Sequence, residues 1–216
     1  MALHIQASAP VSLESGDHLT RDEFHRRYLA RPDIKKAELI DGVVFVASPV
    51  RFDAHAEPHA FIMGWLASYV ARHRHVRIAD NGTVLLGGPD GEFEVQPDAF
   101  LWRDEPGSAQ GPRLNDDGYI EGAPQLVVEV AASSVSYDLH VKRAAYERNG
   151  VHEYVVWRVL DGALDWFRLT AGSYARVEPD AAGLIESSQF PGLRLHVASM
   201  VAGDLAAVIA HLRAVH

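Results

Sequence analysis

Residues 124–157 constrain the fold more than any other part of the chain, because they predict a buried strand, a helix and a second strand in succession. Residues 126–131 form an apolar, β-branched run of the type found in buried strands. One carboxylate, Glu129, lies inside this run. An ionised group in a buried strand is costly unless a cation or hydrogen bonds stabilise it. The sequence therefore predicts a partner for Glu129.

The helix expected after this strand carries the candidate partner. Asp138 is a good N-cap residue and Gly150 is the residue type that closes helices, so we expect the helix over residues 138–150. At helical spacing one face of this helix contains Leu139, Lys142, Ala145 and Tyr146. Lys142 is therefore expected to point inward with the apolar residues, and a single site shared with Glu129 is predicted.

Length and composition favour one domain with a substantial core. The chain has 216 residues, of which 48% are apolar, and residues 19–216 are expected to form a single domain behind a loose tail of residues 1–18. The absence of cysteine excludes disulfides and thiolate metal sites, and fits a reducing cytoplasm. Residues 1–16 lack the features of a signal peptide, and no stretch approaches the roughly 20 apolar residues of a membrane span. We therefore expect a soluble cytoplasmic protein.

The formal charge of −9, with His neutral, argues against tight non-specific binding to nucleic acid. Proteins that bind phosphates usually carry a basic patch. Nucleases are a partial exception, because metal ions neutralise their carboxylates when they act. The net charge of the chain therefore does not exclude a nuclease.

Two dipeptides elsewhere in the chain predict β-hairpins. Asp41-Gly42 and Asp161-Gly162 each stand between strand-like runs, as two-residue hairpin turns require. Helices are also expected, from capping residues and apolar stripes, over about residues 20–30, 58–72 and 204–212. Further strands are expected over about residues 76–79, 83–86, 94–102, 174–177 and 193–197. Strands that alternate with helices predict a mixed sheet flanked by helices, an α/β or α+β fold.

Asp98 is the second acidic residue inside an apolar strand, here the strand expected over residues 94–102. If this strand lies beside the one that holds Glu129, the two carboxylates converge at one sheet edge. Such hard oxygen ligands suit Mg²⁺ or Mn²⁺, which keep several waters and meet a substrate phosphate. The metal would polarise the phosphoryl oxygen and supply a hydroxide-like nucleophile. A nearby lysine could orient that water or stabilise developing negative charge.

Simpler interpretations of these residues stay open. Asp98 follows a proline and could be only a turn or cap residue. Glu129 and Lys142 could form a purely structural ion pair. Lys142 could instead extend its ammonium group into solvent, which is common for lysine.

Two histidines superficially resemble a zinc pair. His55 and His59 are four residues apart with Glu57 between them, but Pro58 indicates that His55 lies before the helix begins. Two ligands on one helix face would need both residues to be helical. One of them is therefore expected at the mouth of the active site, or both at the surface.

Taken together, the motifs resemble the Uma-two family of endonucleases. The resemblance rests on Pro97-Asp98, the Glu129 strand over residues 126–130, Ser133-Ser134, and the run from Asp138 through Lys142, Tyr146 and Gly150 to Tyr154. The family's order is also matched by Glu38 to Gly42, the His-bearing helix start and Phe190-Pro191-Gly192-Leu193. The resemblance spans roughly residues 20–205, nearly the whole chain.

This resemblance implies a restriction-endonuclease-like fold of the PD-(D/E)XK superfamily, in which Asp, Glu and Lys surround a divalent metal. It implies that Asp98 is the motif aspartate, Glu129 the second acid and Glu38 an additional acid. The superfamily places its lysine two residues after the second acid, where this chain has Ala131. Lys142 is the candidate for a migrated replacement, since its helix face points toward the same strand.

The leading hypothesis is a Mg²⁺- or Mn²⁺-dependent endodeoxyribonuclease. Asp98 and Glu129 would hold the metal, and Lys142 and Glu38 would complete the catalytic set. The alternative is a catalytically silent binding or regulatory module on the nuclease scaffold, motivated by Ala131 and the acidic charge. A third hypothesis is a metallohydrolase centred on the two histidines.

A homodimer is expected by analogy with the family, since cutting both strands of a duplex favours paired sites. Trp157 and Trp166 of the second predicted hairpin are candidates for the interface. The alternative is that both tryptophans belong to the core.

Overall fold

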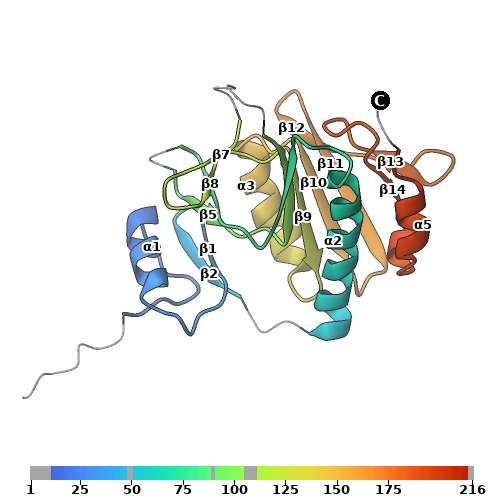
Figure 1. The fold of residues 1–216 in the computed structure, drawn as a ribbon. Coiled ribbons are helices and arrows are strands. Elements are labelled where there is room, and N and C mark those ends of the chain that lie inside the picture. Colours follow the sequence, from blue (N-terminus) through green and yellow to red (C-terminus); the bar gives the residue numbers. More distant parts are fainter. Residues whose placement is uncertain (1–10, 48–50, 89–90, 105–110, 214–216) are drawn as a thin grey trace, which may run out of the picture.

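The structure, a computed structural model, describes residues 11–47, 51–88, 91–104 and 111–213. Within these ranges the strands form two six-stranded sheets and one two-stranded sheet. Figure 1 shows the larger elements side by side, with helix α2 in front of the central sheet and helix α1 at the far end of the molecule.

The central sheet is mixed, as the sequence predicts. Its strands are β3 (Val76–Asp80), β6 (Ala99–Arg103), β9 (Leu126–Ala131), β10 (Glu153–Arg158), β11 (Ala163–Thr170) and β12 (Ser173–Arg176). They lie in the order β12-β11-β10-β9-β6-β3. Strands β9 and β10 run parallel, and the other neighbouring pairs are antiparallel.

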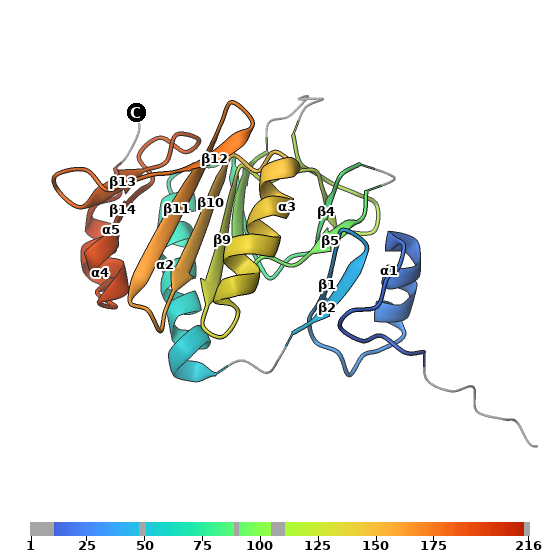
Figure 2. The same ribbon diagram turned by 180° about the vertical axis from the view of Figure 1, so that it is seen from behind.

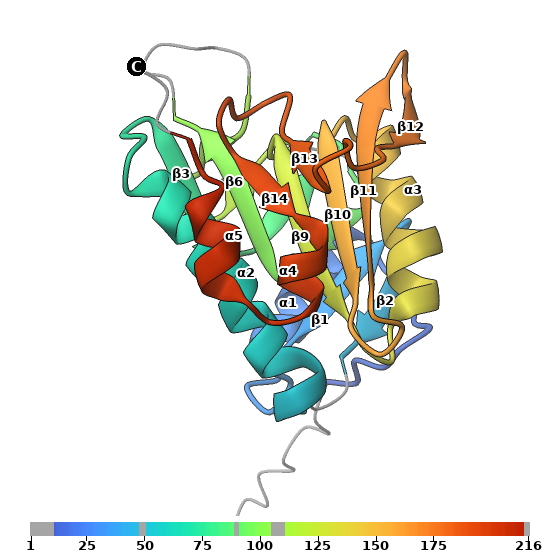
Figure 3. The same ribbon diagram turned by 90° about the vertical axis from the view of Figure 1, so that its right-hand side faces the viewer.

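Helices cover both faces of this sheet. On one face of β9, Leu126, Val128 and Val130 belong to a hydrophobic core that also contains residues of α2 (Glu57–Val70). The opposite face lies in the core that includes α3 (Arg143–Arg148). Figure 3 shows α2 and α3 on opposite sides of the strands. Because side chains alternate along a strand, Glu129 projects toward α3.

The second sheet contains β1 (Ala37–Ile40), β2 (Val43–Val46), β4 (Val84–Leu86), β5 (Phe93–Val95), β7 (Arg113–Leu114) and β8 (Ile120–Glu121). Their order is β2-β1-β5-β4-β8-β7. One face of this sheet packs on Phe24 of α1 (Arg21–Leu29), and the other shares a core with α3. Figure 2 shows the β1–β2 hairpin between α1 and α3. Helix α3 is therefore enclosed by both sheets.

The prediction of a single strand over residues 94–102 is wrong. The segment is divided into β5 and β6, which belong to different sheets. Pro97 explains the break, because it has no N–H for a strand ladder and restricts the backbone of Gln96. Asp98 consequently lies at the junction between the sheets, immediately before β6.

The helix predicted to begin at Asp138 begins earlier. Residues 135–136 are already helical, the π-helical segment η2 (Tyr137–Lys142) follows, and the N–H of Asp138 donates to the carbonyl of Ser134 at 2.9 Å. Asp138 is buried within the helix, and its carboxylate accepts from Ser134 Oγ at 2.6 Å. The N-cap assignment is therefore wrong. Gly150 follows the helix with a φ of 79°, as a helix-closing glycine does.

Other local predictions are confirmed. Thr20 caps α1, and Asp204 caps α5 (Leu205–Ala210). Asp41 and Gly42 have φ values of 51° and 71°, as a type I′ hairpin turn requires. The C-terminal region also contains β13 (Leu184–Glu186), β14 (Arg194–His196) and α4 (Val197–Val201).

Trp157 and Trp166 are buried in the central core, with 3% and 0% of their surface exposed. The core alternative is therefore correct, and the interface alternative for these residues is wrong.

Residues 1–10 of the expected tail lie outside the described residues, whereas Leu13 is buried and the N–H of Gly16 donates to Val44 O of β2. Across the described ranges, no helix is both long and apolar enough to cross a bilayer.

Candidate active site

A cavity of about 450 Å³ lies where the two sheets approach η1 (Phe52–Ala56) and η2. Four buried acids line it, together with two lysines and one histidine: Glu38, Asp98, Glu129, Asp138, Lys36, Lys142 and His55. The four residues predicted to be catalytic are thus brought together in one cavity, although they come from distant parts of the sequence.

Glu129 meets its predicted partner. Its Oε1 atom accepts from Lys142 Nζ and from Tyr146 Oη, each at 2.9 Å. Burial raises the pKa of Glu129 above its ordinary value, Lys142 opposes this shift, and Asp98 adds to it. Lys142 does not extend into solvent, because its side chain is only 3% exposed.

The ammonium group of Lys142 lies among three carboxylates. Besides Glu129, Oε1 of Glu38 is 3.1 Å away and Oδ1 of Asp138 is 3.9 Å away. Burial alone would lower the pKa of Lys142, but these carboxylates together raise it well above its ordinary value. Lys142 is therefore charged and acts as the counter-ion of the cluster.

Glu38 reaches the site from the second sheet. It lies on β1, and its Oε1 atom accepts from the backbone N–H of Gln96 at 2.8 Å. Its Oε2 atom accepts from Tyr137 Oη at 3.2 Å. Burial raises the pKa of Tyr137 above its ordinary value, so the phenol stays a hydrogen-bond donor. Glu38 is thus fixed by the second sheet, by η2 and by Lys142.

Asp98 lies beside Glu129, as the metal hypothesis requires. Strands β6 and β9 are adjacent, with Ala99 opposite Val128, and Oδ2 of Asp98 accepts from the N–H of Val130 at 2.9 Å. Oδ1 of Asp98 accepts from Lys36 Nζ at 2.8 Å. Burial alone would raise the pKa of Asp98, but the hydrogen bond from His55 and the charge of Lys36 hold it well below its ordinary range.

The two histidines contact different parts of Asp98. His55 Nε2 lies 3.2 Å from the Asp98 carboxylate, whereas His59 Nε2 lies 2.9 Å from its backbone carbonyl. His55 belongs to η1, before α2, and lines the cavity as expected. In the part of the chain that the structure describes, no three His, Asp or Glu side chains form a ready-made metal site.

The charges and donor atoms of the site nevertheless fit a divalent cation. Four buried carboxylates line the cavity with Lys36 and Lys142, while the guanidinium group of Arg51 is 80% exposed, so a divalent ion would offset an excess of negative charge inside the cavity. Hydrogen bonds from the described residues reach Oε1 of Glu129 and leave its Oε2 atom for a ligand. Asp98, immediately before β6, and Glu129, on the adjacent strand β9, supply hard oxygen donors, the type that Mg²⁺ and Mn²⁺ prefer.

Sequence reasoning missed Lys36 and the role of Asp138. Lys36 lies two residues before Glu38, and alternate residues of an extended segment share a face, so the position of Glu38 could have indicated it. Asp138 lies four residues before Lys142, the spacing of neighbours on a helix. Because Asp138 was interpreted as an N-cap, its spacing of four residues from Lys142 was not recognised as a contact within the helix.

Comparisons with known proteins identify the family and a related fold. The family model of Uma2, described as "Putative restriction endonuclease", matches residues 21–198. A crystal structure of a "putative nuclease belonging to DUF820" from Anabaena variabilis has 16% sequence identity and a TM-score of 0.62, over 85% of this chain and 99% of that chain. At this identity the likeness concerns the fold. No curated protein matches the chain.

Replacing Lys142 tests the charge balance of the cluster. Lys142→Met leaves Glu129 and Glu38 buried without a cation, so we expect the free energy of unfolding to fall by about 3–5 kcal/mol. In Lys142→Met/Glu129→Gln one of the stranded charges is gone, and the loss should be smaller than the sum of the single losses by about 0.5–3 kcal/mol. Urea unfolding measures both, with the exposed Lys35→Met as control. Strict additivity would contradict the proposed coupling.

Proposed function

We propose, since the chain belongs to the Uma2 family, that it is a divalent-metal-dependent endonuclease that hydrolyses phosphodiester bonds of DNA. A nuclease is the function that the family and the fold support. The metal, the DNA substrate and the residue roles are our proposal. The main support is that Asp98, immediately before β6, and Glu129, on the adjacent strand β9, line one cavity, and that Lys142 contacts Glu129 there.

In this proposal Asp98 and Glu129 hold Mg²⁺ or Mn²⁺. When bound, such an ion polarises a phosphoryl oxygen and lowers the pKa of a coordinated water. The protein contributes fixed ligand positions. The N–H of Val130 orients the carboxylate of Asp98, while Lys142 and Tyr146 orient that of Glu129. Pre-organised ligands avoid the cost of reordering during the reaction.

Lys142 and Glu38 complete the site as positioning residues. Glu38 holds the ammonium group of Lys142 from the side of the second sheet, and Lys142 in turn holds Glu129. The catalytic geometry therefore depends on the packing of the second sheet against η2, through Tyr137 and Gln96.

Removing either proposed ligand tests the function. Asp98→Asn and Glu129→Gln should each lower Mn²⁺-dependent nicking of supercoiled plasmid by at least about 100-fold, because each removes a negative ligand from the site. Glu178→Gln, an exposed site remote from the cavity, is the control, and thermal melting verifies folding. Undiminished cutting by both variants would exclude this site.

A catalytically silent module is the second candidate. It is favoured by Ala131 at the place of the motif lysine and by the enclosure of Lys142 among carboxylates. Titration calorimetry with Mn²⁺ separates the two. The nuclease should bind the ion at sub-millimolar concentration, whereas a folded protein that binds none up to millimolar levels supports the silent module. Plasmid nicking by the wild type would eliminate the silent module.

A homodimer is also part of the proposal, because two sites are needed to cut both strands in one encounter. Trp157 and Trp166 are buried in the core, so the proposed interface does not include these side chains. Light scattering should give a molar mass twice that of the chain. A monomer at concentrations at which plasmid is linearised in one step would contradict this.

A further inference from the structure

We propose that Lys36, rather than Lys142, is the cation that binds a phosphate of the substrate in this cavity. The inference rests on the proposed function and extends it by assigning the phosphate contact to a particular residue. It follows from a comparison of how the two ammonium groups are surrounded.

Lys142 is enclosed by carboxylates. Its ammonium group donates to Glu129 at 2.9 Å, and it also lies 3.1 Å from Glu38 and 3.9 Å from Asp138. Its side chain is only 3% exposed. A phosphate could approach it only by displacing buried carboxylates, which would leave them without a counter-charge. Lys142 therefore acts through Glu129 and Glu38.

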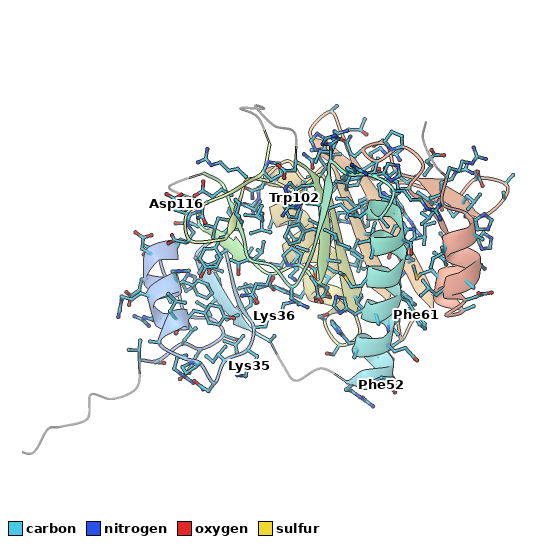
Figure 4. The ribbon with its side chains drawn as sticks, in the orientation of Figure 1. Lys35, Lys36, Phe52, Phe61, Trp102 and Asp116 are labelled. Carbon is cyan, nitrogen blue, oxygen red and sulfur yellow. The ribbon has the colours of Figure 1, made fainter. Side chains whose placement is uncertain are left out.

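Lys36 is differently placed. It precedes β1, and its Nζ atom lies 2.8 Å from Asp98 Oδ1 and 3.4 Å from Asn81 Oδ1. These two contacts leave one N–H for a further acceptor. The side chain is 23% exposed and lines the cavity. In Figure 4 Lys36 lies between the second sheet and the central sheet. The ammonium group is thus held next to Asp98 while remaining open to a ligand.

A phosphate needs such a cation in this cavity, because four carboxylates line it and repel anions. The lining residue Arg51 is also cationic, but its side chain is 80% exposed and therefore strongly screened by solvent. An ammonium group that is partly withdrawn from water interacts more strongly with a phosphate. Lys36 combines this partial burial with contact to a proposed metal ligand, so it would bring the phosphate beside Asp98.

The test is the salt dependence of DNA binding, which does not require cleavage. A fluorescein-labelled 20-base-pair duplex is titrated with the full-length protein in Ca²⁺, over a series of NaCl concentrations. Lys36→Ala should weaken binding by about tenfold or more, because a charge-assisted contact is lost. The slope of log K against log[NaCl] should fall by about 0.9, since one phosphate contact is removed.

Matched variants separate phosphate contact from structural damage. Lys35→Ala changes the adjacent exposed lysine, which donates to Pro32 O, and should leave the slope unchanged. Lys36→Arg should restore the wild-type slope, and melting temperatures show whether Asp98 stays in a folded protein. A wild-type slope in folded Lys36→Ala, with the wild type still cutting DNA, would overturn this inference alone. No DNA binding by the wild type would overturn the inference and the proposed function together.

Discussion

The ammonium group of Lys142 is the point at which the two sheets and the helix between them meet. It contacts Glu129 of the central sheet and Glu38 of the second sheet, and it is itself carried by η2. Removing these charges from water is costly, and the cost is offset only when hydrogen bonds satisfy the remaining atoms. Tyr146 and Tyr137 provide those hydrogen bonds. The cluster therefore fixes the relative position of the elements that form the cavity.

Such a cluster is poor evidence for stability alone, because apolar residues of similar size often serve a core equally well. It is better explained by function. Strongly perturbed pKa values of buried acids that line a cavity are typical of reactive sites. Here burial raises the pKa of Glu129, whereas His55 and Lys36 hold that of Asp98 low against the effect of burial.

The sequence predicts the parts of this structure that local patterns encode. Strand alternation and helical spacing predict the contact between Glu129 and Lys142, and the family resemblance and mixed sheet are confirmed. Pro97 is a local signal for the break within residues 94–102, but the sheet that each half joins depends on long-range pairing, which no local pattern encodes. Glu38 could be identified only through the resemblance, because its role depends on how the second sheet packs against η2. Lys36 had a local signal, its spacing of two residues from Glu38, but this signal indicates the site only once Glu38 is placed there.

Diffraction from a crystal soaked in Mn²⁺ would show whether Asp98 and Glu129 are metal ligands. We expect one anomalous peak within bonding distance of the carboxylates of Asp98 and Glu129, with Lys142 still in contact with Glu129. A peak elsewhere, for example between His59 and Asp80, or an unoccupied site at millimolar Mn²⁺, would contradict this assignment.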